Sequence, residues 1–240
     1  MRPMHEQSTH EESTEHFFTS FTDLLVGIIF IFMLLLMVFA LNYKKAETTN
    51  KEAVETLVTT EELRDELLKA IAGRMQQEGT NVTLDLDNGI VRLPEDLLFA
   101  SGQWQLSEQG KQFLGKLAGV MMNTVPCSVA SRSGVKIDCQ LLRRSTLLDS
   151  ILIEGHTDKQ PFAGANGMTN WELSAFRAIS VYRALVEAEP ALEVDLKNQR
   201  RQPILGVSAY AERRPVDTKN LDPNRRIDLR FNMRAPKAAQ

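Results

Sequence analysis

The feature that most constrains this chain is an unbroken apolar segment near its N-terminus. Residues 24–41, LLVGIIFIFMLLLMVFAL, contain no charged residue and no proline. A helix rises about 1.5 Å per residue, so this segment and the three residues before it match the ~30 Å hydrocarbon core of a bilayer. The sequence predicts one transmembrane helix over residues 17–43. A cleaved signal peptide is the alternative, but the preceding residues are acidic and no small-residue cleavage site follows.

Asp23 lies at the start of this apolar segment. The aromatic residues Phe17, Phe18 and Phe21 precede it and would mark the membrane interface, which places Asp23 within the helix. An ionisable group in lipid is costly, so it normally faces a partner helix or water and marks an ion path. Alternatively, Asp23 is a helix N-cap, since aspartate favours that position and the positive end of the helix dipole. The position alone leaves both interpretations open.

The segments on either side of the membrane helix are polar. Residues 1–16 are acidic and have no hydrophobic period, which predicts a disordered tail. Residues 44–79 are rich in Glu, Lys, Ala and Leu, and a capping-box pattern at 59–62 precedes apolar residues at helical spacing. We expect a helical stalk that packs against a second copy or its own domain rather than against the membrane.

Residues 80–234 have the pattern of a compact α+β domain. Residues 82–93 alternate around Asn88–Gly89, which predicts a hairpin because that pair tolerates positive φ. The elements expected after the hairpin are a helix over 106–120, a strand over 147–154, a helix over 170–187 and two strands over 204–210 and 226–231. The expected order is β-β-α-β-α-β-β, a mixed sheet with helices on one face, followed by a tail over 235–240.

Charge and cysteine content narrow the function. The net charge of −3 provides no basic field, so we expect no direct nucleic-acid partner. Cys127 and Cys139 are the two cysteines and lie in the loop over 123–146, where an even pair suits a disulfide in an oxidising compartment. The alternative is two reduced, buried thiols on the cytosolic side.

Three motifs carry the chemistry of the C-terminal region. They are EGHTD at residues 154–158, NWELSAFRA at 170–178 and NRRI at 224–227. Together they resemble the OmpA-like peptidoglycan-binding domain over about residues 82–231. The resemblance implies that Asp158 and Arg177 hold the amino and carboxylate ends of diaminopimelate in the cell-wall peptide, and we expect both to be exposed in one cleft.

The residues agree with such a role, because a zwitterion needs one anionic acceptor and one cationic fork, and arginine offers a carboxylate two donors. Without the resemblance, Asp158 and Arg177 would be interpreted as a surface ion pair. Thr157 and Asn170 would add neutral hydrogen bonds, whereas Trp171 and Leu173 would pack the helix against the domain. One of Arg225 and Arg226 would face the ligand and the other solvent.

Metal and catalytic chemistry are not expected. His156 and Asp158 offer two ligands at most, with no further ligand expected nearby, and His5, His10 and His16 lack a compact spacing. The sequence contains no Ser/His/Asp order and no Gly-rich phosphate loop. We therefore expect neither an enzyme nor a cofactor.

The whole chain resembles the B subunits of ion-driven stator units, of which flagellar MotB is the familiar case; residues 170–178 are especially similar. The resemblance implies a homodimer inside a ring of MotA-like A subunits and a C-terminal domain fixed to peptidoglycan. It also implies that Asp23 carries the transported ion, H⁺. It also implies an N-terminus in the cytoplasm and a C-terminal domain in the periplasm, across the inner membrane. Lys44 and Lys45 follow the helix while only Arg2 precedes it, which by itself predicts the reverse orientation.

Within this group, residues 20–41 and the acidic tail are more similar to the B subunits of the Zorya anti-phage defence system, which implies a ZorA-like partner. Two alternatives remain open. One is a flagellar stator subunit, and the other is a passive tether between membrane and cell wall, which would gain nothing from an ionisable group at Asp23.

Overall fold

The computed structural model describes residues 8–134, 139, 147–164 and 167–234. The chain divides into two units, with the boundary between Glu55 and Thr56. One helix, α1 (Ser8–Gln77), contributes its first part to the first unit and its last part to the second.

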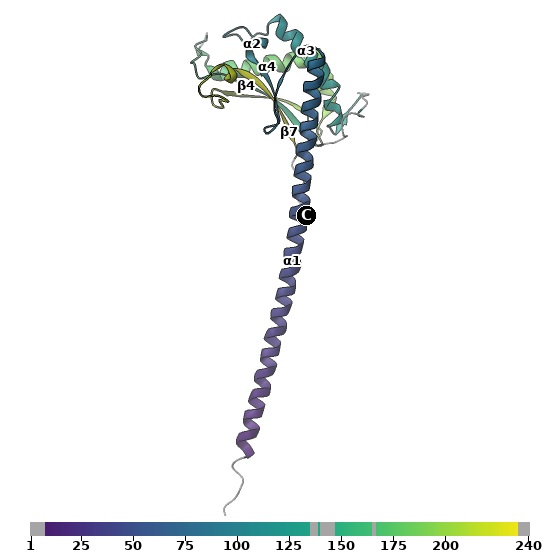
Figure 1. Cartoon of the computed structure of the whole chain (residues 1–240), viewed down its shortest axis with the longest axis vertical. Coiled ribbons are helices and arrows are strands. Elements are labelled where there is room, and N and C mark those ends of the chain that lie inside the picture. The colour runs from purple at the N-terminus through teal and green to yellow at the C-terminus, as the bar shows by residue number, and fades with distance from the viewer. Residues whose placement is uncertain (1–7, 135–138, 140–146, 165–166, 235–240) are drawn as a thin grey trace, which may run out of the picture. The chain divides into compact units, whose positions relative to one another are not determined.

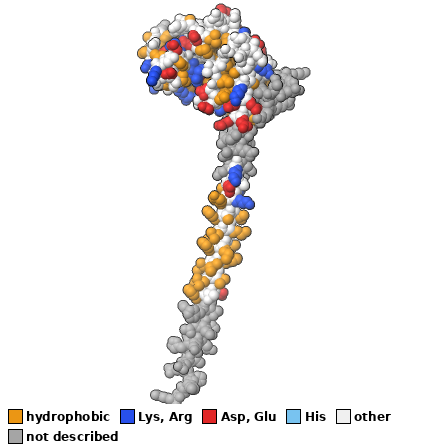
Figure 2. All heavy atoms as spheres, viewed as in Figure 1, with side chains coloured by type: hydrophobic (Ala, Val, Ile, Leu, Met, Phe, Trp, Pro, Cys, Tyr) orange, Lys and Arg blue, Asp and Glu red, His pale blue; other side chains and the backbone are white. Residues whose placement is uncertain are grey.

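The first unit consists of the first part of α1. Its stretch Phe21–Thr49 is long and apolar enough to cross a membrane, with a mean hydropathy of 3.2 in its most apolar window. Large hydrophobic side chains along this stretch are exposed rather than packed, and Figure 2 shows them covering the visible face. Length and composition therefore agree with the predicted transmembrane segment.

One expectation and one open alternative for the start of the chain are wrong. Residues 8–16 were expected to be disordered, but α1 begins at Ser8; residues 1–7 lie outside the described residues. Asp23 therefore lies well inside a helix, where backbone N–H groups already have helical partners, and it is not an N-cap. The helix also does not restart at residues 59–62, because α1 continues through this capping-box pattern.

The second unit is an α+β domain, which confirms the predicted class. Its elements after α1 are β1 (Thr83–Asp85), β2 (Ile90–Pro94), α2 (Glu95–Leu98), α3 (Glu108–Met122), η1 (Val125–Cys127), β3 (Ser131–Arg132), β4 (Leu148–His156), α4 (Asn170–Ala188), α5 (Ala191–Val194), β5 (Leu196–Lys197), β6 (Leu205–Ala211), η3 (Asp222–Asn224) and β7 (Arg226–Met233).

The main sheet has the strand order β1-β2-β7-β4-β6, with a separate pair formed by β3 and β5. Strands β4 and β6 are parallel, while β1 with β2, β2 with β7, and β4 with β7 are antiparallel, so the sheet is mixed as predicted. Helix α4 packs against β4 and β6, and α3 packs against α4 (Figure 1). Strands β4 and β6 are parallel, and α4 lies in the crossover connection between them.

The two faces of the sheet differ because side chains alternate along each strand. On β7, Ile227, Leu229 and Phe231 belong to the hydrophobic core, while Arg226, Asp228 and Arg230 point to the other face. Strands β2 and β4 follow the same alternation. One face therefore supports the helices, and the other carries charged side chains.

The last part of α1 belongs to the core of this domain. Leu67, Leu68, Ile71 and Met75 are fully buried in the same cluster as the core residues of β2, β4 and β7. Arg64 Nη2 donates a hydrogen bond to Leu86 O in the β1–β2 hairpin at 2.8 Å. The apolar stripe of the expected stalk thus packs against its own domain, and the compact unit starts at Thr56 rather than at residue 80.

Two local predictions agree with the structure. Residues 83–94 form the expected hairpin, in which Gly89 has the positive φ of 67°. Cys127 and Cys139 form a disulfide with a Cα–Cα distance of 5.7 Å, and both half-cystines are buried in the core. The bond closes part of the cysteine loop, of which residues 135–138 and 140–146 lie outside the described part.

Candidate ligand-binding site

The candidate site forms where the loop after β4 meets the first turns of α4. Gly155 in β4 lies directly against the backbone of Ser174 in α4, and a Cβ at this position would overlap the Ser174 carbonyl oxygen. The Ser174 hydroxyl also accepts a hydrogen bond from Ala211 N at 3.2 Å, which ties α4 to the end of β6. This close contact positions the residues that follow β4 beside α4.

The start of α4 is fixed by a capping box. Thr169 N donates to Glu172 Oε2 at 2.7 Å, and the Thr169 hydroxyl accepts from the first turn of the helix. Asn170 Nδ2 donates to Gln160 O at 3.1 Å, so it fastens the loop after β4 to the helix. Asn170 thus supports the site through the loop.

A cavity of about 160 Å³ lies at this junction. Five of the six residues predicted to bind peptidoglycan line it, together with Glu95: Thr157, Asp158, Asn170, Arg177 and Arg225. A second cavity of about 440 Å³ shares Glu95, Ser101 and Arg225 with it. The structure therefore brings together side chains from α2, the loop after β4, α4 and the segment after η3.

Charged contacts organise the cavity. Arg225 Nη1 donates to Asp158 Oδ2 at 2.8 Å, and Arg177 Nη2 donates to Glu95 Oε1 at 2.5 Å. Arg177 Nε donates to Gln103 O at 2.8 Å, and its guanidinium lies 5.4 Å from the centre of the Phe99 ring. Each arginine is thus held in place by a carboxylate.

Burial changes the acid–base properties of these groups. Burial lowers the pKa of Arg177 and outweighs the opposing effect of Glu95. Burial raises the pKa of Glu95, although Arg177 and Arg225 act in the opposite direction. The hydrogen bond to Asp158 raises the pKa of Arg225. Two cationic forks beside two carboxylates give the site the groups needed for a zwitterionic ligand.

The Thr157 side chain lines the cavity and is buried. Its Oγ1 has no hydrogen-bond partner within the part of the chain that the structure describes, whereas Thr157 N donates to Ala211 O at 2.9 Å. Because a buried hydroxyl without a partner costs free energy, it is well placed to bond a ligand.

Several expectations for this site are wrong. Asp158 and Arg177 were expected to be exposed, but their exposed fractions are 6% and 2%. The interpretation without the resemblance, a surface ion pair between the two, does not hold either, because Asp158 bonds Arg225 and Arg177 bonds Glu95. Trp171 was expected to pack against the domain and is instead 45% exposed, while Leu173 is buried as predicted.

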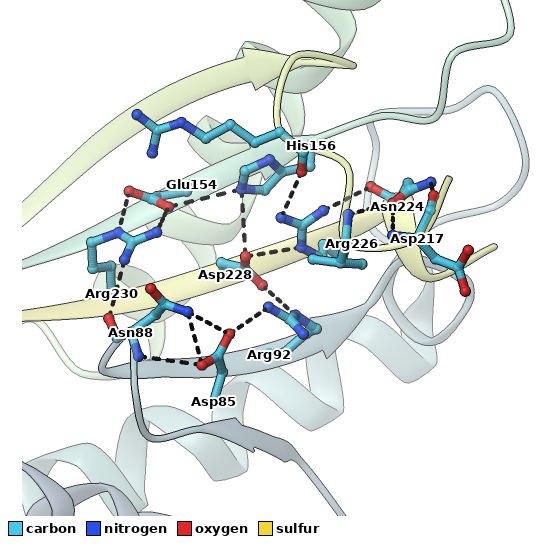
Figure 3. Close-up of polar contacts among 12 residues, drawn as sticks. Asp85, Asn88, Arg92, Glu154, His156, Asp217, Asn224, Arg226, Asp228 and Arg230 are labelled. Atoms are coloured by element: carbon cyan, nitrogen blue, oxygen red, sulfur yellow. Dashed lines mark hydrogen bonds and ion pairs between the residues drawn. The ribbon is translucent and has the colours of Figure 1, made fainter. Parts of the chain in front are cut away.

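Arg226 does not belong to the site and does not face solvent. It is 4% exposed, and its Nε donates to Asp228 Oδ2 at 2.9 Å on the charged face of the sheet. Arg225 directly precedes β7 in an extended conformation and Arg226 is the first residue of the strand, so their side chains point to opposite sides. Arg225 lines the cavity, and Arg226 enters a buried ionic network (Figure 3).

This network was not foreseen from the sequence. Glu154, His156 and Asp228 are all buried, and their ligand atoms lie within 4.8 Å of one another. The expectation that no further metal-ligating residue lies near His156 is therefore wrong. However, Arg230 donates to both oxygens of Glu154 at 2.8 and 2.9 Å, and Arg92 and Arg226 each bond one oxygen of Asp228. A cation would have to displace three guanidinium groups, so the cluster fits an ion-pair network better than a metal site.

Glu95 is the site residue that sequence reasoning missed. It follows Pro94 at the start of the short helix α2, far from the motifs that marked the site. In the sequence it is one of many acidic residues, and no local pattern signals burial. The one available hint is its place directly after a strand that ends in proline.

Residues 130–228 match the model of the OmpA family. The match includes β4, α4, β6 and the start of β7, and with them all six residues predicted to bind peptidoglycan. Helix α2 and the β1–β2 hairpin lie outside it. The second unit is thus an OmpA-like domain that follows an N-terminal apolar helix. The matched region is less than half of the chain.

Solved structures with similar folds include the periplasmic domain of Helicobacter pylori MotB, at 19% identity, with a TM-score of 0.42 and coverage of 60% of this chain and 73% of that chain. A putative MotB-like protein from Desulfovibrio vulgaris is 22% identical, with a TM-score of 0.45 and coverage of 73% and 97%. The cell wall anchor of the T6SS from Pseudomonas aeruginosa is 19% identical, with a TM-score of 0.44 and coverage of 68% and 94%. No curated protein matches the chain. The OmpA-like assignment rests on the family match rather than on these structures.

Proposed function

We propose that this chain is the B subunit of an ion-driven motor in the bacterial inner membrane, anchored to peptidoglycan by its OmpA-like domain. The observation that carries the proposal is the combination, in one chain, of Asp23 inside an apolar helix and a charged cavity in an OmpA-like domain. The proposal includes no catalytic activity and no cofactor apart from the transported ion, which we take to be a proton.

The cavity suits the zwitterionic end of diaminopimelate in the cell-wall peptide. Arg177 and Arg225 provide donors for a carboxylate, Asp158 provides an acceptor for an ammonium group, and the Thr157 hydroxyl provides a neutral contact. Two charged ends fix the orientation of a ligand more strictly than one. Recognition of a zwitterion is therefore the best use of these side chains.

Binding is tested by pull-down of the full-length chain with purified peptidoglycan. Because Arg177 and Asp158 are buried, conservative variants are preferable to alanine. We expect Arg177→Lys and Asp158→Asn each to reduce binding about tenfold, the size of one charge-assisted contact. Arg200→Lys and Asp149→Asn are matched controls, since this ion pair lies outside the cavity and Arg200 is exposed. Unchanged binding in both site variants would move the ligand elsewhere.

The role proposed for Asp23 follows from its place in α1. A carboxylate inside an apolar helix is costly in lipid and is expected to face a partner, here a ring of MotA-like A subunits around two copies of α1. In this arrangement the N-terminus lies in the cytoplasm and the OmpA-like domain in the periplasm. The disulfide supports the periplasmic placement, because such bonds persist in oxidising compartments.

We predict that Asp23→Asn abolishes ion-driven activity while membrane insertion and assembly with the A subunit persist. The amide has the same size but cannot accept or release a proton. Thr22→Ser changes the neighbouring residue as a control. Proton flux into vesicles containing both subunits is the measurement. Flux of the Asn variant equal to that of the unaltered chain would reduce Asp23 to a passive residue and favour a tether.

For the biological role we propose anti-phage defence, with the chain acting as a ZorB subunit of a Zorya system beside a ZorA-like partner. Support comes from the sequence resemblance of residues 20–41 and of the acidic tail. Plaque assays and swimming assays on a deletion strain separate the alternatives. Loss of phage protection with normal swimming supports defence, and loss of swimming supports a flagellar stator.

A further inference from the structure

Glu95 contacts both arginines to which the proposed function assigns the ligand carboxylate. It is 6% exposed and lies between the two arginines of the site. Its Oε1 bonds Arg177 Nη2, and its Oε2 lies 3.6 Å from Arg225 Nε. That second oxygen is buried and has no hydrogen-bond partner among the described residues. Glu95 is therefore paired strongly with one arginine and incompletely with the other.

The contacts of the arginines limit how a ligand can enter. Arg177 bonds Gln103 O through Nε and Glu95 through Nη2. Arg225 bonds Asp158 through Nη1 and Asp222 through Nη2. A ligand carboxylate that takes both an Nη atom of Arg177 and the Nε of Arg225 would meet Glu95 between them. Two carboxylates at that place would repel each other in a buried site.

Protonation of Glu95 would remove this repulsion, and the surroundings of Glu95 favour it. The charged groups that face it are Arg177 from α4, Arg225 from the segment after η3, and Asp158 from the loop after β4; Asp96 follows it in α2. Burial raises the pKa of Glu95, and the Asp158 carboxylate adds to that increase, while both arginines oppose it. A neutral Glu95 binds Arg177 less strongly and no longer repels an incoming carboxylate.

We propose that Glu95 competes with the ligand carboxylate for Arg177. When the ligand binds, Glu95 takes up a proton from solvent and leaves Arg177. The inference rests on the proposed function and adds a regulation to it. By linkage, a site that takes up a proton on binding holds its ligand more tightly as the pH falls. Attachment to the cell wall would then strengthen where the surroundings of the domain are more acidic.

The test uses the full-length chain in detergent and a soluble tripeptide, N-acetyl-L-alanyl-γ-D-glutamyl-meso-diaminopimelate, as the probe. Acetylation removes the alanyl amino group, which would titrate near pH 8, and the remaining carboxyl groups are ionised throughout the range from about pH 5.5 to pH 8. For the unaltered chain we expect affinity to rise about tenfold from pH 8 to pH 5.5, roughly the value of one charge-assisted contact. Glu95→Gln should bind about tenfold more tightly than the unaltered chain at pH 8 and lose this pH dependence. Asp96→Asn is the matched control and should keep the original profile.

Each outcome decides between interpretations. Weaker binding by Glu95→Gln at every pH would show that Glu95 accepts the ligand ammonium group, and an unchanged profile would remove it from the linkage; either overturns the inference. If Glu95→Gln does not fold, calorimetry of the unaltered chain in two buffers of different ionisation enthalpy measures proton uptake directly, and zero uptake overturns it. No binding of the tripeptide or of peptidoglycan by the unaltered chain at any pH is the separate failure of the proposed function.

Discussion

Single residues on the charged face of the sheet show how buried charges are tolerated in this domain. Glu154 and Asp228 are fully buried, yet each carboxylate oxygen has an arginine donor. His156 stacks on Tyr210 with ring centres 5.4 Å apart, and burial lowers its pKa even though Glu154 and Asp228 oppose the effect. Such a network is costly to interrupt, because removal of one partner leaves another charge buried without compensation.

Glu154 makes this network sensitive to acid. Burial alone would raise its pKa, but the nearby His156 ring and the two hydrogen bonds from Arg230 prevail and lower it from 4.5 to about 2. As the pH falls, the unfolded chain therefore takes up this proton first. The stabilisation, on the order of 3 kcal/mol, is complete above about pH 5 and is lost toward pH 2.

We predict that the urea midpoint of unfolding of the unaltered chain decreases as the pH is lowered from about 5 to about 3. Glu154→Gln should flatten this part of the plot of midpoint against pH and lower the stability at pH 7. Glu187→Gln, at an exposed position, is the control and should keep the original slope. A profile for Glu154→Gln that falls as steeply as that of the control would show that other carboxylates cause the acid sensitivity.

Among the elements, the contact between β4 and α4 decides whether the site is assembled. Gly155 allows the strand to approach the Ser174 backbone, and the loop that carries Asp158 leaves β4 from this point. Arg177 lies about one helical turn after Ser174. A small displacement at this contact would therefore separate the two charged groups of the site.

We predict that Gly155→Ala destabilises the domain by about 3 kcal/mol, at the upper end for overpacking, since the added Cβ meets backbone rather than a flexible side chain. Peptidoglycan binding should fall with it. The control is Gly115→Ala in α3, where a Cβ meets nothing and the helix should gain up to about 1 kcal/mol. Thermal unfolding of both variants is the measurement. An unchanged melting temperature for Gly155→Ala would contradict the close contact.

Elements with a strong local pattern could be predicted from the sequence. The expected strand over 226–231 and helix over 170–187 agree closely with Arg226–Met233 and Asn170–Ala188, because alternation and helical period are local properties. The capping-box pattern at 59–62 is also local, and it wrongly indicated the start of a new helix. A local pattern cannot show that the helix before it continues, as α1 does here. Glu95 was missed because its contact with Arg177 joins residues far apart in the chain, which no local pattern records.

At the scale of the whole molecule, the boundary of the folded domain matters most for experiments on it. The sequence placed that boundary at residue 80, where the strand period begins. The structure includes the last turns of α1, whose Leu67, Leu68, Ile71 and Met75 are fully buried. Burial of a large apolar side chain contributes roughly 1.5–3 kcal/mol, so these four contribute on the order of 6–12 kcal/mol, similar to the 5–15 kcal/mol that stabilises a typical domain.

We therefore predict that a fragment of residues 56–234 unfolds cooperatively on heating, whereas a fragment of residues 80–234 has no cooperative transition and binds hydrophobic dyes. Within the longer fragment, Leu68→Ala should cost about 2–5 kcal/mol, because it leaves a cavity in the core. Its exposed neighbour provides the control, and Lys69→Ala should change stability by less than about 0.5 kcal/mol. Similar melting temperatures for the two fragments would mean that α1 is dispensable for the core, and the domain would then begin at the hairpin.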